Sequence, residues 1–154
     1  MPSADVLAMI RKAYDFGTYP KGYIPNKEEP KIQEAIIQEL KSQLDPRFAN
    51  IIVDKPEDVI VGAPVAYDLG LPLIHYPKER PLDDRLFFRQ ESACLLFELN
   101  DFDLIREIVE RIGRVGGTVG MVLAVIDEDK GVRESVEAMG ISCRALFKRS
   151  ELDQ

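Results

Sequence analysis

Acidic and amide side chains follow an apolar run at Glu98, Asn100, Asp101 and Asp103. A helical pattern begins among them, at Phe102. In α/β proteins, a strand that passes directly into a helix often holds a phosphorylated ligand, because the free amides of the helix attract anions. The four polar side chains are therefore candidates for a sugar-phosphate site. The alternative is structural, since the same residue types end strands and cap helices.

Three cations stand near other predicted strand ends and could contact an anion: Lys55, Lys78 and Arg80. The carboxyl ends of parallel strands meet at one edge of a sheet, so these cations and the acidic run would share that edge. Their alternative role is that of solvated loop side chains, which is the commoner one for lysine and arginine. We find no metal-binding pattern, because the chain has a single histidine.

Hydrophobic periodicity predicts the elements that position these residues. Helices are expected at residues 3–16 and 31–44, in a segment ending near Gly70, and at 102–115 and 132–139. Strands are expected at residues 50–54, 71–76, 86–88, 94–99, 121–127 and 143–147. Residues 17–30 form a loop or an extended arm, because prolines and glycines interrupt them.

Strands that alternate with helices over short connections predict an α/β fold with a doubly wound, mainly parallel sheet. The strands are apolar on both faces, which indicates helices on both sides of the sheet. We expect a single domain over residues 1–154. Residues 1–49 would form a helical N-terminal region with its arm, and residues 50–154 the α/β core.

Composition limits the kinds of partner. The 154 residues are 45% hydrophobic and carry a formal net charge of −7, which is typical of a soluble globular protein and argues against a nucleic-acid surface. No apolar run approaches the roughly 20 residues of a membrane helix, so a membrane is not an expected partner. The acidic net charge likewise means that nucleic acid is not an expected partner. Cys94 and Cys143 lie in apolar runs and are interpreted as reduced core residues of a cytoplasmic protein.

Two long segments of the chain resemble a known family. The run GAPVAYDLGLPLIHYPKE has a helix, then Leu69-Gly70-Leu71-Pro72, then an apolar strand with Lys78 after it. The run VGGTVGMVLAVIDEDKGVRESVEAMGISCRALFKRSEL has a strand ending in Asp127, a charged turn, a short helix and a last strand. In order and spacing these segments resemble the type I phosphoribosyltransferases, and most of all orotate phosphoribosyltransferase, over residues 50–152.

The resemblance implies a binding loop for phosphoribosyl pyrophosphate (PRPP) after the strand at 94–99, and a pyrophosphate loop after the strand at 50–54. Glu98 and Asp101 would be the ribose contacts, within a site completed by Asn100 and Asp103. Lys55, Lys78 and Arg80 would be the pyrophosphate contacts. Both loops depart from the family pattern, because acids and a proline stand where glycines and hydroxyls would hold phosphate.

These departures have an electrostatic consequence. Aspartates at a helix N-terminus satisfy its amides and repel an incoming phosphate, by about 4 kcal/mol per charge pair at 4 Å and an effective dielectric of 20. We therefore expect an orotate phosphoribosyltransferase-like protein without normal PRPP-dependent catalysis, binding a nucleotide, base or sugar phosphate in a regulatory role.

Two alternatives stay open: an active enzyme that transfers ribose 5-phosphate to orotate or another base, and an α/β assembly module. The resemblance implies Mg²⁺ only for the active enzyme, so otherwise no cofactor is expected. It also implies a homodimer.

Overall fold

The computed structural model describes residues 29–152. The helix predicted at residues 3–16, and nearly all of the arm predicted at 17–30, lie outside the described residues. Within the described part, five strands form one sheet: β1 (Asn50–Val53), β2 (Leu73–His75), β3 (Glu91–Leu99), β4 (Thr118–Asp127) and β5 (Ser142–Lys148). All neighbouring strands are parallel, in the order β2-β1-β3-β4-β5. The predicted doubly wound parallel sheet is thus confirmed.

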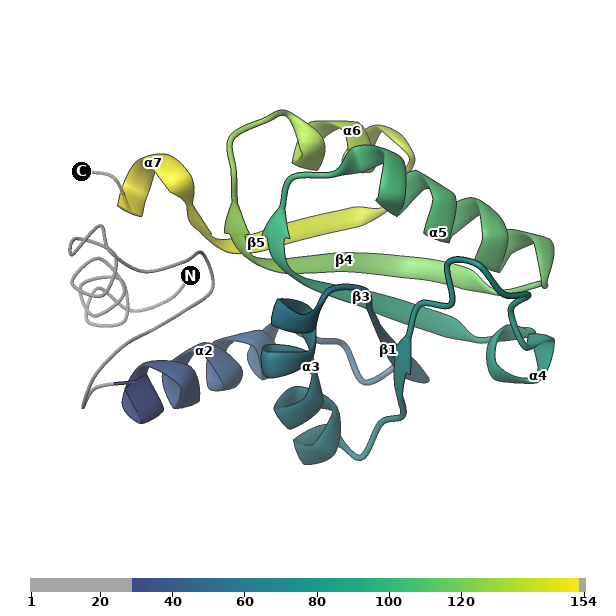
Figure 1. Cartoon of the computed structure of the whole chain (residues 1–154), viewed down its shortest axis with the longest axis horizontal. Coiled ribbons are helices and arrows are strands. Elements are labelled where there is room, and N and C mark those ends of the chain that lie inside the picture. Colours follow the sequence, from purple (N-terminus) through teal and green to yellow (C-terminus); the bar gives the residue numbers. More distant parts are fainter. Residues whose placement is uncertain (1–28, 153–154) are drawn as a thin grey trace.

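Helices cover both faces of this sheet (Figure 1). One face carries α2 (Glu29–Gln43) and α3 (Pro56–Leu69), and the other carries α5 (Phe102–Arg114) and α6 (Val132–Ala138). Two single turns complete the described chain, α4 (Asp84–Phe87) and α7 (Arg149–Leu152). None of these helices is long and apolar enough to cross a membrane.

Strand β3 shows why the apolar runs are nearly continuous. Leu95 and Phe97 face the core under α2 and α3, whereas Cys94 and Leu96 face the core under α5 and α6. A central strand covered on both faces has no exposed side for polar residues. Cys94 and its counterpart Cys143 on β5 are both buried free thiols, as expected of core residues.

The strand predicted at residues 86–88 is wrong. These residues belong mainly to the helical turn α4, which begins because the Asp83 carboxylate accepts a hydrogen bond from the backbone N–H of Arg85, 3.0 Å away. Phe87 turns into the core, while Leu86 and Phe88 remain exposed. Three apolar residues in a row therefore do not mark a strand here, since only the middle one is buried.

The connection between β1 and α3 is also shorter than predicted. A loop was expected from Lys55 onward, but α3 begins at Pro56. Proline suits the first turn of a helix, because the backbone donor that it lacks has no partner within the helix there. The end of α3 agrees with prediction, since Gly70 adopts the left-handed conformation that favours glycine, with φ +68°.

Candidate functional site

The order of the strands reverses between β1 and β3, which lie side by side in the middle of the sheet. The chain leaves β1 toward the β2 edge and leaves β3 toward the β5 edge, so a crevice opens where the two strands end. Their pairing runs only from Asn50↔Ser92 to Ile52↔Cys94, whereas β3 continues to Leu99. In an open parallel sheet this crevice is the expected ligand site.

A small cavity lies in this crevice, and we call it the switch-point hollow. It is lined by residues from the ends of both strands and the starts of both following helices: Lys55, Glu57, Asp58, Leu96, Glu98, Asn100, Asp101 and Leu104. Its cavity volume is about 20 Å³, which is room for one or two water molecules. With its open mouth the depression measures about 340 Å³. A sugar phosphate would therefore have to lie in the mouth.

Four of the seven residues proposed from the sequence meet in the hollow: Lys55, Glu98, Asn100 and Asp101. The Asn100 amide Nδ2 donates to Glu98 Oε2 at 3.2 Å. Asp101 is the N-cap of α5, and its Oδ1 accepts from the backbone N–H of Leu104 at 3.1 Å. The capping role is thus confirmed for Asp101, and its carboxylate occupies the helix amide that a phosphate would use.

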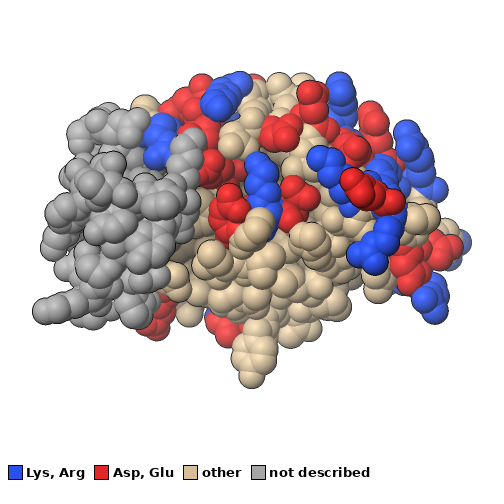
Figure 2. Space-filling view, viewed as in Figure 1, with Lys and Arg blue, Asp and Glu red and all other residues tan. Residues whose placement is uncertain are grey.

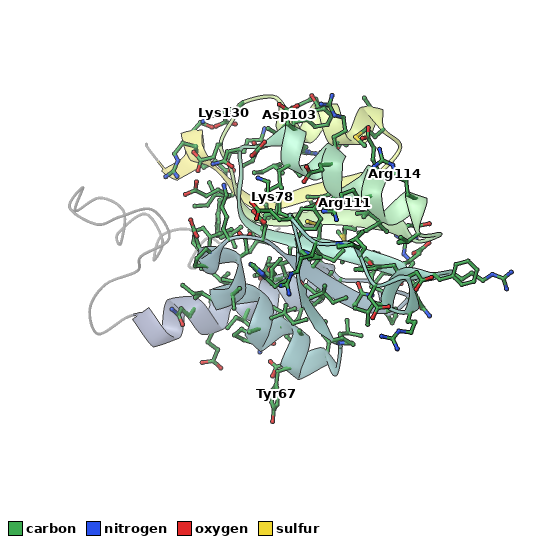
Figure 3. All side chains as sticks on the ribbon, turned by 45° about the vertical axis from the view of Figure 1, so that its right-hand side comes forward. Tyr67, Lys78, Asp103, Arg111, Arg114 and Lys130 are labelled. Carbon is green, nitrogen blue, oxygen red and sulfur yellow. The ribbon has the colours of Figure 1, made fainter. Side chains whose placement is uncertain are left out.

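The other three proposed residues lie outside the lining of the hollow. Asp103 is exposed on α5 and forms an ion pair with Arg106 at 3.3 Å. Lys78 and Arg80 lie exposed in the connection between β2 and α4. In Figure 3, Lys78 lies near Arg111 of α5, far from Tyr67 of α3. Their proposed contact with an anion stays a prediction.

Arg111 fixes the connection that carries Lys78 and Arg80. Its guanidinium donates to the backbone carbonyls of Pro77 (3.1 Å), Lys78 (3.2 Å) and Arg80 (2.5 Å). It also donates to the Tyr76 hydroxyl at 2.8 Å, and that hydroxyl donates to Glu107 Oε2 at 2.7 Å. This segment is therefore bound to α5 along its length.

Asp58 is a buried residue of the hollow that sequence reasoning did not single out. It is only 2% exposed, and its carboxylate accepts three backbone N–H groups. Oδ2 accepts from Asp54 at 3.1 Å and from Lys55 at 2.8 Å, and Oδ1 accepts from Phe97 at 2.7 Å. Burial raises the pKa of this carboxyl above its ordinary value, although the three amides act in the opposite direction.

The residues around the hollow favour hydrogen-bond donors over anions. Four carboxylates line it, from Glu57, Asp58, Glu98 and Asp101, against the single cation of Lys55. Within residues 29–152, no three or more His, Cys, Asp or Glu side chains are arranged to hold a metal ion.

No family model matches this chain, and no curated protein matches it by sequence. Solved structures do match. Orotate phosphoribosyltransferase from Aeropyrum pernix has a TM-score of 0.69 at 17% identity, with 96% of each chain covered. The Mycobacterium tuberculosis H37Rv enzyme in complex with inorganic phosphate has a TM-score of 0.67 at 16% identity, covering 99% of this chain and 92% of that one.

Adenine phosphoribosyltransferase from Thermoanaerobacter pseudethanolicus has a TM-score of 0.65 at 17% identity, covering 79% of this chain and 83% of that one. At sequence identities this low, the matches are evidence for a shared fold alone. The chain has the fold of the type I phosphoribosyltransferases, as the sequence resemblance implied.

Proposed function

We propose that this chain is an orotate phosphoribosyltransferase-like protein that does not catalyse PRPP-dependent transfer. It would bind a base or a nucleoside as a regulatory ligand. The observation that supports this is the switch-point hollow, where four carboxylates face one lysine and the cavity has room for only one or two water molecules. A pyrophosphate group would be repelled by these acids and could lie only in the open mouth of the hollow.

The same residues are suited to ligands that donate hydrogen bonds. Carboxylate oxygens of Glu98 and Glu57 accept from hydroxyl and amino groups, which a nucleoside or a base supplies. A nucleotide or a sugar phosphate fits less well than a base or a nucleoside, because its phosphate must also approach these acids. Lys55 is the only cation in the lining, and it would have to offset that repulsion alone.

A transfer assay tests the absence of catalysis. Purified protein with PRPP, Mg²⁺ and a panel of bases that includes orotate and adenine is expected to release no pyrophosphate above the blank. Calorimetry with the same bases and their nucleosides is expected to detect binding without Mg²⁺. Glu98→Gln should weaken that binding by about tenfold, because a carboxylate accepts donor groups more strongly than an amide does.

One result would establish the rival function, an active phosphoribosyltransferase. That result is pyrophosphate release that disappears in both Glu98→Ala and Asp101→Ala. Asp101→Asn serves as the matched control, because asparagine caps a helix about as well as aspartate does. If neither turnover nor binding of any base, nucleoside or sugar phosphate is detected, the third function, an assembly module, replaces both.

We also propose that two copies of the chain associate through α3. Ile60 and Tyr67 lie one above the other on this helix and are 49% and 86% exposed. Figure 2 shows an uncharged region over the lower part of the molecule, where Figure 1 places α3, and Figure 3 shows Tyr67 pointing outward. Since the chain carries a net charge of −7, an uncharged face is where a second copy approaches with least repulsion.

Tyr67→Asp is expected to weaken this association at least tenfold, because it places a charge in an apolar contact of two like-charged molecules. Tyr67→Phe is the control and should leave the association intact. Light scattering over a range of protein concentrations measures both variants. A wild-type protein that stays monomeric at every concentration would exclude the homodimer.

A further inference from the structure

We infer that Asp58 is an internal ligand: its carboxylate fills an anion site between the ends of β1 and β3 that a free carboxylate would otherwise occupy. The inference deepens the proposed function and rests on it, because it explains why the switch-point hollow does not accept an anion. The site itself consists of backbone N–H groups, which the sequence alone does not identify. Asp58 reaches them from the first turn of α3.

The donors come from two separate parts of the chain. Asp54 and Lys55 follow β1 and direct their N–H groups to Oδ2, while Phe97 lies in β3, 39 residues away from Asp58, and directs its N–H to Oδ1. An ordinary capping acid in the first helical turn would need only the Lys55 amide. Three donors that converge on both oxygens of one carboxylate resemble the way in which a protein holds a bound anion.

The sheet explains why these amides are available. β1 ends at Val53, and its last pair with β3 is Ile52↔Cys94, so β1 offers no partner to the Phe97 amide. Since Phe97 is buried, its N–H would lose a hydrogen bond if Asp58 were absent. The Asp58 carboxylate therefore joins the segment that follows β1 to β3, beyond the point where the two strands pair.

The chemistry and the size of the site define its ligand. Asp58→Ala removes only the carboxyl group, and the space left behind matches formate. It is lined by three N–H donors and lies next to the small cavity of the hollow. A planar carboxylate reproduces the native geometry, whereas tetrahedral phosphate is larger and would press against the neighbouring acids of the hollow.

Rescue by formate tests the inference. We expect formate, compared with chloride at the same ionic strength, to raise the melting temperature of Asp58→Ala by roughly 4 °C or more. The wild-type protein should change little, because its site is filled. Asp58→Asn should also change little, because the asparagine side chain still occupies the space. In amide NMR spectra of Asp58→Ala, formate should shift the Lys55 and Phe97 signals.

Three outcomes would overturn the inference. The first is a folded Asp58→Ala whose melting temperature and amide signals respond equally to formate and chloride. The second is stabilisation by inorganic phosphate but not by formate. The third applies if Asp58→Ala does not fold in chloride: cooperative melting should then return in formate, and its failure to return contradicts the internal ligand. The transfer assay uses wild-type protein and PRPP, so either proposal can fail without the other.

Discussion

Replacing Asp58 by asparagine is expected to lower the free energy of unfolding by about 3 kcal/mol at neutral pH. Asparagine keeps the size of the side chain and can still accept the Phe97 amide through its oxygen. Its NH₂ group, however, would then face the N–H groups of Asp54 and Lys55, which now share Oδ2. Two partly buried donors lose their acceptor, and each such loss costs about 1–3 kcal/mol when the donor is shielded from water.

Glu57→Gln is the matched control for this experiment. Glu57 stands beside Asp58 in the first turn of α3 and also lines the hollow, but it is less deeply buried. Its replacement should change the free energy of unfolding by no more than about 0.5 kcal/mol. Denaturant unfolding of both variants measures the difference. Equal stability of Asp58→Asn and the wild-type protein would show that the three amides do not depend on the carboxylate.

The same variant isolates a pH effect. Burial raises the pKa of Asp58 above its ordinary value near 4, so the folded state binds the proton more tightly than the unfolded chain does. The proton-linked part of this group's contribution to stability is therefore largest in acid and is lost as the pH rises through the raised pKa, whereas its hydrogen bonds to the three amides remain at neutral pH. Asp58→Asn lacks this contribution. The stability difference between the two proteins should thus grow as the pH is lowered from neutral toward about 4.

Much of the fold was predictable from the sequence, because a strand that is buried on both faces of the sheet appears in the sequence as a nearly continuous apolar run. The apolar run at residues 94–99 has no polar positions until Glu98, and it lies inside β3 of the structure. Strand ends were less predictable. β3 begins three residues earlier, at Glu91, where backbone pairing with β4 continues into polar residues. Parallel pairing alone extends a strand beyond its hydrophobic signal.

The position of the candidate site was predictable, but its central residue was not. Glu98 and Lys55 come from strand ends that a parallel sheet brings together, so the sequence placed them at one edge. In the sequence, Asp58 is only one of the acids that stand where the pyrophosphate loop of the family would hold phosphate. Its partner Phe97 lies in another strand, and the hydrogen bond between them depends on how far β1 extends along β3. No local sequence pattern indicates how far β1 extends along β3.

The contacts of cationic residues near a strand end were also hard to predict from the sequence. Lys78 and Arg80 follow β2, as predicted, but their backbone carbonyls accept hydrogen bonds from Arg111 on α5. Periodicity identified the buried face of α5, with Ile105 and Ile108, and gave no reason to connect an arginine on that helix with a segment some 30 residues earlier. Such side chain-to-backbone contacts follow from tertiary packing.

A second large effect is expected where β4 ends, at the same edge of the sheet as the hollow. Arg149→Ala should lower the free energy of unfolding by about 3 kcal/mol. The Arg149 guanidinium donates to both oxygens of Glu128, at 2.7 and 3.1 Å, and the Glu128 side chain is only 5% exposed. Removing the arginine takes both of these bonds from a buried carboxylate, which is far more costly than losing an exposed ion pair.

Arg133→Ala provides the comparison, because its ion pair with Glu137 at 3.2 Å is exposed on both sides. Its loss should cost no more than about 0.5 kcal/mol. A double-mutant cycle then identifies the cause of the Arg149 effect. If the cost comes from the charge left behind, adding Glu128→Gln to Arg149→Ala should restore part of the stability, since a neutral amide is easier to bury than a carboxylate. If the double variant is less stable than Arg149→Ala, then Arg149 acts mainly by fixing α7 against the end of β4, where Ser150 N–H also donates to Asp129 at 2.9 Å.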